Sequence, residues 1–327
     1  MPLQIFRNAG RIAIYALVLS LISTPMMFAA GEAEEAAVEE DTLVEIVEVN
    51  WLDIEATTGI TRVVLESLGY ETESSDVSVP VAFQALESDE ADFFLGVWMP
   101  SMQSEWERFI DNGSVQEAAM NLEGARYTLA VPQYAYDAGV TSIADLADHE
   151  EEFGGQIYGI EPGNDGNRLI LDMIDDDAFG LGGWELVESS EAAMLSEVGN
   201  AVRNDEWIAF LGWEPHPMNT RFDIDFLADG DDYFGPDYGA ATVHTAVRQG
   251  LLEESPNLGQ FLQNLRFTLE QENELMLMID EEGMDAQEAG REWLISNPGI
   301  LDEWLDGVVA VDGTDGVQAV RAALDID

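Results

Sequence analysis

The chain has 327 residues, of which 46% are hydrophobic and eight are tryptophan, so it has enough apolar content for more than one core and does not resemble a disordered chain. Aspartate and glutamate total 66 against 12 basic residues, all of them arginine, and the formal net charge is -54. This charge argues against nucleic acid or a membrane surface as a partner, because the chain has few cations with which to neutralise phosphates.

The N-terminal segment has the features of an export signal. Arg7 and Arg11 precede an apolar stretch over residues 12–30, and no acid occurs before Glu32. We predict a signal peptide over 1–30 that is cleaved between Ala29 and Ala33. The alternative is an uncleaved membrane anchor, for which the run is short. Residues 31–41 are expected to form an acidic flexible leader, and the sequence contains no cysteine that could carry a lipid, so we expect a free periplasmic protein.

Strand and helix patterns alternate from Thr42 onward. A strand expected over 44–49 leads through Trp51 and Asp53 into a helix over 54–68, and a buried strand over 92–97 leads to Trp98. Helices are expected at 81–88 and 103–110. In open α/β sheets, ligands bind outside the carboxyl ends of the strands, so these aromatic and acidic residues occupy positions suited to a site.

The middle of the chain continues this alternation. After a turn expected at Glu123–Gly124, a strand over 127–131 begins with Tyr127 and is followed by a loop over 132–139. A strand over 156–160 leads to Asn164, close to the start of a helix over 168–174. Further elements are expected at 184–187 (strand), 191–203 (helix) and 207–212 (strand, delivering Trp213), and then mostly helices, at 257–269, 272–279, 285–296 and 301–305.

Trp51, Trp98, Tyr127 and Trp213 thus lie at or beside strand ends, and each of them could alternatively be a core residue. Several aromatic faces suit a quaternary ammonium ion, because the ring faces attract the cation and its methyl groups gain by leaving water. Aromatic platforms also bind sugars, so the number of rings does not separate the two ligand classes. Asp53 could alternatively serve only to cap the following helix.

Five segments carry a resemblance to a known family. They are Trp51-Leu52-Asp53-Ile54, Trp98-Met99-Pro100-Ser101, Tyr127 with Thr128-Leu129-Ala130-Val131-Pro132, Gly159-Ile160-Glu161-Pro162-Gly163-Asn164, and Gly212-Trp213-Glu214-Pro215-His216. These segments and their order resemble those of the choline-binding members of the glycine betaine/choline ABC-transporter binding proteins. The resemblance covers nearly all of the chain after the predicted signal peptide.

The resemblance implies an α/β fold of the two-lobed periplasmic binding protein type (type II), in which each domain has a central sheet flanked by helices and the chain crosses the hinge twice. We expect lobe I over 42–121 plus 219–327 and lobe II over 122–218. The resemblance also implies that the trimethylammonium group is surrounded by Trp51, Trp98, Tyr127 and Trp213. The hydroxyl end of choline would be bound by Asp53 and Asn164. The implied partner is a membrane permease, and acetylcholine or betaines are possible further ligands. We expect a monomer. The resemblance implies neither a cofactor nor catalysis.

Asp53 favours choline over the betaines within this family, because a ligand carboxylate would meet a like charge there. A glycine betaine or proline betaine receptor is the nearest alternative. Outside the family, the alternatives are a secreted glycosidase with tryptophan platforms and paired carboxylates, and a nonenzymatic surface protein.

The remaining acids and histidines do not indicate a metal site. His149, His216 and His244 are widely spaced, and the acids at 223–225 and 229–232 miss the calcium-loop spacing. We interpret the acid excess as adaptation to high salt, which screens repulsion between surface carboxylates.

Overall fold

The structure is a computed structural model that describes residues 42–326. The predicted signal peptide over 1–30 and leader over 31–41 lie outside the described residues. Nine strands form one sheet, in the order β2-β1-β3-β9-β4-β7-β5-β6, with β8 paired to β4. The strands are β1 (Leu43–Glu48), β2 (Glu71–Asp76), β3 (Phe93–Met99), β4 (Val115–Pro132), β5 (Gln156–Tyr158), β6 (Glu185–Val187), β7 (Ala209–Glu214), β8 (Ile224–Phe226) and β9 (Ala240–Arg248).

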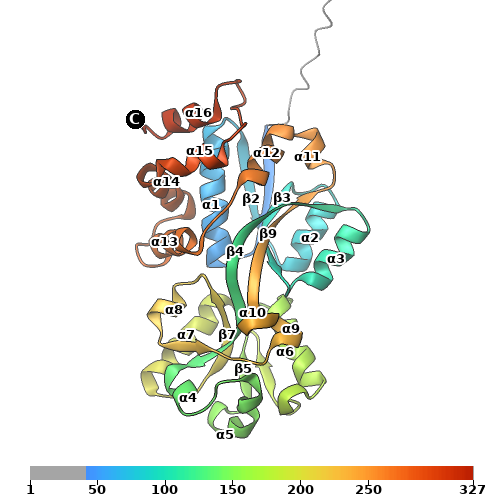
Figure 1. Ribbon diagram of the computed structural model, residues 1–327, viewed down its shortest axis with the longest axis vertical. Coiled ribbons are helices and arrows are strands. Elements are labelled where there is room, and N and C mark those ends of the chain that lie inside the picture. Colours follow the sequence, from blue (N-terminus) through green and yellow to red (C-terminus); the bar gives the residue numbers. More distant parts are fainter. Residues whose placement is uncertain (1–41, 327) are drawn as a thin grey trace, which may run out of the picture. The chain divides into compact units, whose positions relative to one another are not determined.

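The sheet has two parallel halves joined by two long antiparallel strands. In the first half, β1 pairs in parallel with β2 and β3, and in the second, β5 pairs in parallel with β6 and β7. Strand β4 pairs with β9 along its first part and with β7 along its last part, so β4 and β9 run side by side between the halves (Figure 1). Strand β3 is buried along nearly its whole length, as expected for a strand covered on both faces, whereas the residues of the edge strand β2 are exposed or half-buried.

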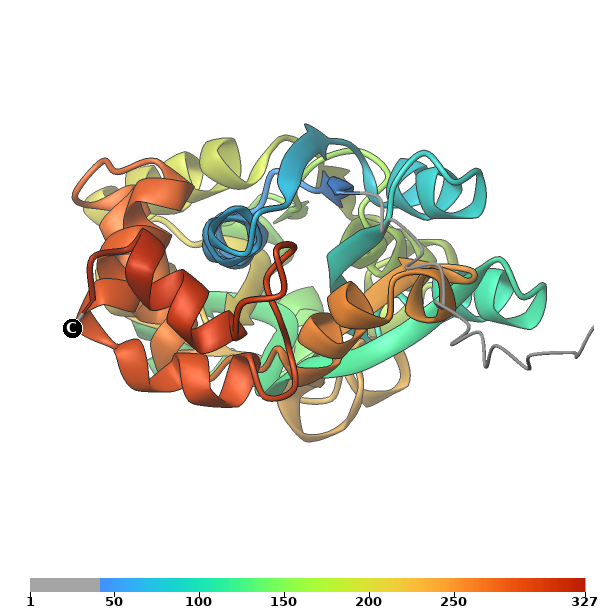
Figure 2. The same ribbon diagram turned by 90° about the horizontal axis from the view of Figure 1, so that it is seen from above.

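Helices cover the sheet. They are α1 (Leu52–Ser67), α2 (Val79–Glu87), α3 (Gln103–Asp111), α4 (Gln133–Asp137), α5 (Glu150–Phe153), α6 (Asp165–Asp175), α7 (Glu191–Asn204), α8 (Met218–Arg221), α9 (Asp231–Phe234), α10 (Pro236–Gly239), α11 (Leu251–Glu254), α12 (Pro256–Asn264), α13 (Leu269–Asp280), α14 (Ala286–Ser296), α15 (Leu301–Trp304) and α16 (Gly316–Ala323), with 3-10 turns at Ile143–His149, Ala178–Gly180 and Pro298–Ile300. Helix α1 packs against the C-terminal helices α13 and α14, beside which it lies in Figure 2. Within residues 42–326, no helix is long and apolar enough to cross a membrane.

The α1 contact explains two glycines. A Cβ on Gly59 would stand 2.5 Å from Cβ of Ala286, and a Cβ on Gly290 would stand 2.6 Å from Cα of Ile60. Side chains at these positions would push α1 and α14 apart. The two glycines therefore allow close packing behind the helix that begins next to Trp51.

One sequence prediction about strands was wrong, and one strand was missed. The expected turn at Glu123–Gly124 is the interior of β4, where the pairing with β9 shifts between Glu123 and Ala125 and Gly124 has φ +79°. The glycine accommodates a bulge in a continuous strand instead of ending it. The C-terminal part is mostly helical, as predicted, but it also contains β9, which the sequence analysis did not predict, with Ala241, Val243 and Thr245 buried on one face. This alternation was a usable signal, but three alanines weakened it.

Three helix predictions were also imprecise. The expected loop over 132–139 contains α4, and α6 begins at Asp165 instead of Arg168 because Asn164 caps it. The helix expected over 257–269 ends at Asn264. There Phe267 bridges to Leu122 of β4, and Thr268 starts α13 with a capping box.

The predicted lobe boundaries stay a prediction. The contacts favour a second crossing, back to the first half of the sheet, at a point later than Met218. Strand β8 pairs with the end of β4, and α9 contacts α6. Residues 224–234 thus pack with the second half of the sheet.

Candidate functional site

All six residues predicted to form a site line one pocket. Trp51 is the residue before α1, and Asp53 is the second residue of that helix; Trp98 lies in β3, Tyr127 in β4, Asn164 before α6, and Trp213 in β7. Ile160 and Asp165 complete the lining, and the pocket has about 280 Å³ of empty space, which includes space open to solvent. The pocket therefore combines residues of both halves of the sheet.

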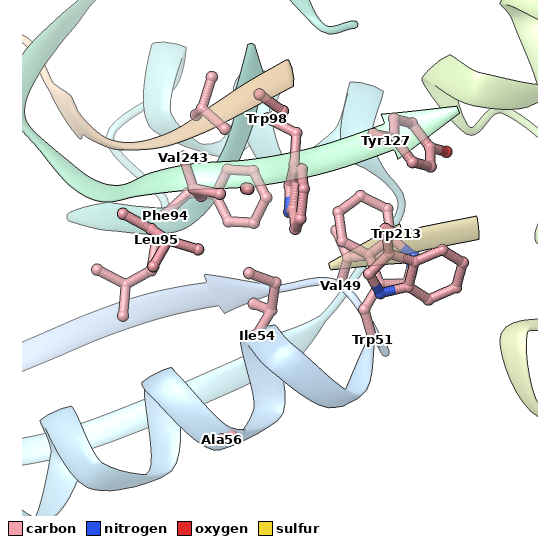
Figure 3. Packing of buried hydrophobic residues seen from close by; sticks show 14 of the residues in the cluster. Val49, Trp51, Ile54, Ala56, Phe94, Leu95, Trp98, Tyr127, Trp213 and Val243 are labelled. Atoms are coloured by element: carbon pink, nitrogen blue, oxygen red, sulfur yellow. The ribbon is translucent and has the colours of Figure 1, made fainter. Parts of the chain in front are cut away.

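The four aromatic side chains are buried and turn toward one common space (Figure 3). Tyr127 and Trp213 are direct partners on the antiparallel strands β4 and β7, and their ring centroids are 6.2 Å apart at 75°. The ring of Trp98 lies 5.9 Å from that of Tyr127. Strand register thus places two of the rings, because residues directly opposite on antiparallel strands point to the same face.

Asp53 is a buried carboxylate at the base of this aromatic group, with 2% of its surface exposed. Its Oδ2 accepts a hydrogen bond of 3.2 Å from Trp98 Nε1. Burial raises the pKa of Asp53 to about 7, the nearby charge of Glu191 adds to this, and the bond from Trp98 and the first backbone N–H groups of α1 oppose it. Such a group would be stabilised in its charged form by a cation in the pocket.

Asn164 is held by a full set of donors. Its Oδ1 accepts hydrogen bonds from Gly166 N at 2.8 Å, Asn167 N at 3.2 Å and Tyr127 Oη at 3.0 Å. Burial raises the pKa of Tyr127 well above its usual value, so this phenol stays protonated and donates. Because Oδ1 is fully used, Asn164 has only its Nδ2 group to offer a ligand, and that group acts as a donor.

Asp165 is a pocket residue that sequence reasoning missed. It is 3% exposed, and burial raises its pKa to about 6 against the opposing effect of the Ser101 hydroxyl. Asn164 Nδ2 approaches its Oδ1 at 3.3 Å. The pocket thus contains two carboxylates, and the lining residues of the described chain include no arginine. The position of Asp165 next to Asn164 was a usable signal in the sequence, but a single acid is not distinctive among 66 aspartates and glutamates.

Solved structures of transport binding proteins are similar to this chain in sequence and fold. A solved choline binding protein of an ABC transporter, in complex with choline, is 48% identical, covers 87% of this chain and 98% of its own, and superposes with a TM-score of 0.85. Lactococcal OpuAC, in its closed conformation with glycine betaine, is 28% identical, covers 81% of this chain and 99% of its own, and has a TM-score of 0.73.

A curated relative, the glycine betaine/carnitine transport binding protein GbuC of Listeria monocytogenes, is 37% identical over 163 residues, which is 50% of this chain and about half (53%) of that protein. The fold is that of the type II periplasmic binding proteins, as the sequence predicted. We call the part with β1–β3 and α1 the first lobe and the part with β5–β7 and α6–α7 the second. Residues 42–296 match the family model described as the substrate binding domain of the ABC-type glycine betaine transport system, and the chain belongs to this family of transport binding proteins, which are not enzymes.

Proposed function

We propose that this protein captures choline outside the cytoplasmic membrane and delivers it to the permease of an ABC transporter. The observation that carries the proposal is the pocket itself, in which four aromatic rings and the buried carboxylate of Asp53 face one space without a basic side chain. A trimethylammonium group gains both from the ring faces and from leaving water. The relative with 48% identity, whose structure contains choline, supports the same ligand.

The six predicted residues divide into two groups in this proposal. Trp51, Trp98, Tyr127 and Trp213 surround the methyl groups, and Asp53 and Asn164 bind the hydroxyl. The hydroxyl donates to the carboxylate of Asp53 and accepts from Nδ2 of Asn164, because Oδ1 of Asn164 already accepts three hydrogen bonds. An alcohol that can donate and accept at once satisfies both side chains.

Betaines fit this pocket less well. The carboxylate of glycine betaine would approach Asp53 and Asp165 without an arginine in the lining to balance it. Acetylcholine has no hydroxyl with which to donate to Asp53, and so we expect it to bind more weakly than choline. The pocket chemistry favours choline among the quaternary ammonium ligands.

Export completes the proposal. A binding protein of this family meets its ligand outside the cytoplasmic membrane, and the arginine-flanked apolar segment over 12–30 supports removal of residues 1–30 on export to the periplasm. Mass spectrometry of the exported protein would give the new N-terminus, which we expect between Ala29 and Ala33.

Calorimetric titration in molar salt with choline, acetylcholine, glycine betaine and a neutral sugar tests the ligand assignment. We expect the tightest binding for choline and none for the sugar. Asp53→Asn should weaken choline binding about tenfold or more and reduce the discrimination against glycine betaine, since a hydrogen bond to a charged group contributes about 1.5–3 kcal/mol.

The matched control is Asp111→Asn, which changes an exposed aspartate at the end of α3. It should bind like the wild type. Tighter wild-type binding of glycine betaine than of choline would overturn the choline assignment, and unchanged selectivity of Asp53→Asn would overturn the role of Asp53.

A further inference from the structure

Two acids of the second lobe accept hydrogen bonds from adjacent residues of the first. Both carboxylate oxygens of Glu161 lie near Trp51 Nε1, at 3.0 and 3.1 Å. Glu191 Oε2 accepts from the backbone N–H of Leu52 at 3.3 Å. Neither acid lines the pocket, yet both hold the segment from which Trp51 and Asp53 enter it.

Glu191 supplies a cap that α1 lacks in its own sequence. The N-cap residue is Trp51, which makes no side-chain capping bond, and Leu52 carries the first N–H group of the helix. Such groups have no partner within a helix, and a negative charge next to them is favourable. A carboxylate of the other lobe therefore caps the helix that holds Asp53.

Each of the two acids is also tied to a pocket residue of its own lobe. His216 Nδ1 accepts from Met218 N at 3.0 Å, so Nε2 carries the proton and donates to Glu191 Oε1 at 3.0 Å. The His216 ring in turn lies 5.0 Å from that of Trp213. Glu161 O accepts from Asn164 N at 3.1 Å.

We propose that Glu161 and Glu191 are positioning residues that fix Trp51 and the start of α1 in the binding pocket when the two lobes come together on the ligand. The proposal rests on the proposed function. Separation of the lobes would break both contacts, so they add to the stability of the closed, ligand-bound state and not to the first encounter with the ligand. Burial raises the pKa of Glu161, and the hydrogen bond from Trp51 opposes this shift.

The test is stopped-flow tryptophan fluorescence with choline in molar salt at pH 8, on Glu161→Ala and Glu191→Ala. We expect the dissociation rate of choline to rise about tenfold in each variant, because a hydrogen bond to a charged group is worth at least a factor of ten. The association rate should change less than twofold, since capture on the open protein does not use these contacts.

Glu197→Ala is the matched control, because Glu197 lies exposed on the same helix as Glu191. It should leave both rates unchanged. Glutamine variants separate hydrogen bonding from charge. Glu161→Gln keeps an acceptor for Trp51 and should dissociate more slowly than Glu161→Ala. Glu191→Gln cannot accept from both Leu52 N–H and the protonated Nε2 of His216, so it should approach Glu191→Ala.

A structural role alone would lower the melting temperature of ligand-free Glu161→Ala, whereas we expect that temperature to match the wild type. Glu191→Ala also removes the acceptor of His216 within the second lobe, so its melting temperature is expected to fall and does not serve as this control. Dissociation rates equal to that of the wild type, or a rate change confined to association, would overturn the proposal. Failure of the proposed function looks different, because the wild type itself would then not bind choline.

Discussion

At the scale of residues, the charge of Asp53 is the most sensitive property of the pocket. Burial and Glu191 raise its pKa to about 7, and it raises in turn the pKa of Glu272, a buried acid of α13 whose pKa is elevated first by burial. A cation in the pocket favours the ionised form of Asp53, so binding and deprotonation are coupled.

Choline affinity should therefore depend on pH. Because the pKa of Asp53 without ligand is raised to about 7, the ionised form that binds a cation is present above that pH and is lost as pH falls through it. We expect an affinity about tenfold lower at pH 6 than at pH 8, measured by calorimetry at constant salt.

The control for this dependence is Asp53→Asn. It should retain only the weaker dependence due to Asp165, whose pKa is about 6. Equal wild-type affinity at pH 6 and pH 8 would show that Asp53 does not change its charge on binding.

At the scale of elements, the start of α6 is built around one close approach. A Cβ on Gly166 would stand 2.0 Å from Tyr127 Oη, although glycine inside a helix costs about 1 kcal/mol relative to alanine. The missing side chain lets the tyrosine hydroxyl reach Asn164 at 3.0 Å. Gly166 therefore makes α6 less stable than alanine would, but it leaves room for the Tyr127 hydroxyl.

Gly166→Ala should displace the hydroxyl of Tyr127 and weaken choline binding more than tenfold, as a loss of about 1.4 kcal/mol in the pocket would do. Gly183→Ala is the control, because a Cβ at Gly183 meets no atom within 4 Å. Titration of both variants checks this, and equal affinities would contradict it.

At the scale of the whole molecule, the net charge of -54 governs stability. The acids greatly outnumber the arginines that could pair with them, and exposed ion pairs contribute little in any case. The carboxylates therefore repel one another in dilute buffer, where the Debye length is long, and this repulsion is screened at molar salt, where it is about 3 Å.

The melting temperature should accordingly fall as sodium chloride is lowered from molar to millimolar concentration. Sucrose at matched osmolarity is the control, since it favours compact states without screening charge. We expect sucrose to restore only a minor part of the lost stability. A melting temperature that is the same in dilute buffer and in molar salt would count against adaptation to high salt.

Much of the pocket was predictable because its residues stand at strand ends. Trp51, Trp98 and Trp213 each lie at or near the end of a strand that the hydrophobic pattern locates correctly to within two residues. The sequence analysis did not find strand β9 or the bulge at Gly124. Alanines weaken the alternating pattern of β9, and the Glu123-Gly124 pair resembles a turn. The role of Glu161 was equally hidden, since its partner Trp51 is 110 residues away.

In the sequence by itself, the alternation of strand and helix patterns indicated the α/β class, and five short segments carried the resemblance that implied the family and the six residues that line the pocket. Only the tertiary structure decided which groups those residues have left to offer a ligand. The three donors to Asn164 Oδ1, the burial of Asp53 and Asp165, and the contacts from Glu161 and Glu191 to the start of α1 join residues far apart in the chain. Burial and hydrogen-bond partners arise from packing between distant segments, and no local pattern records them.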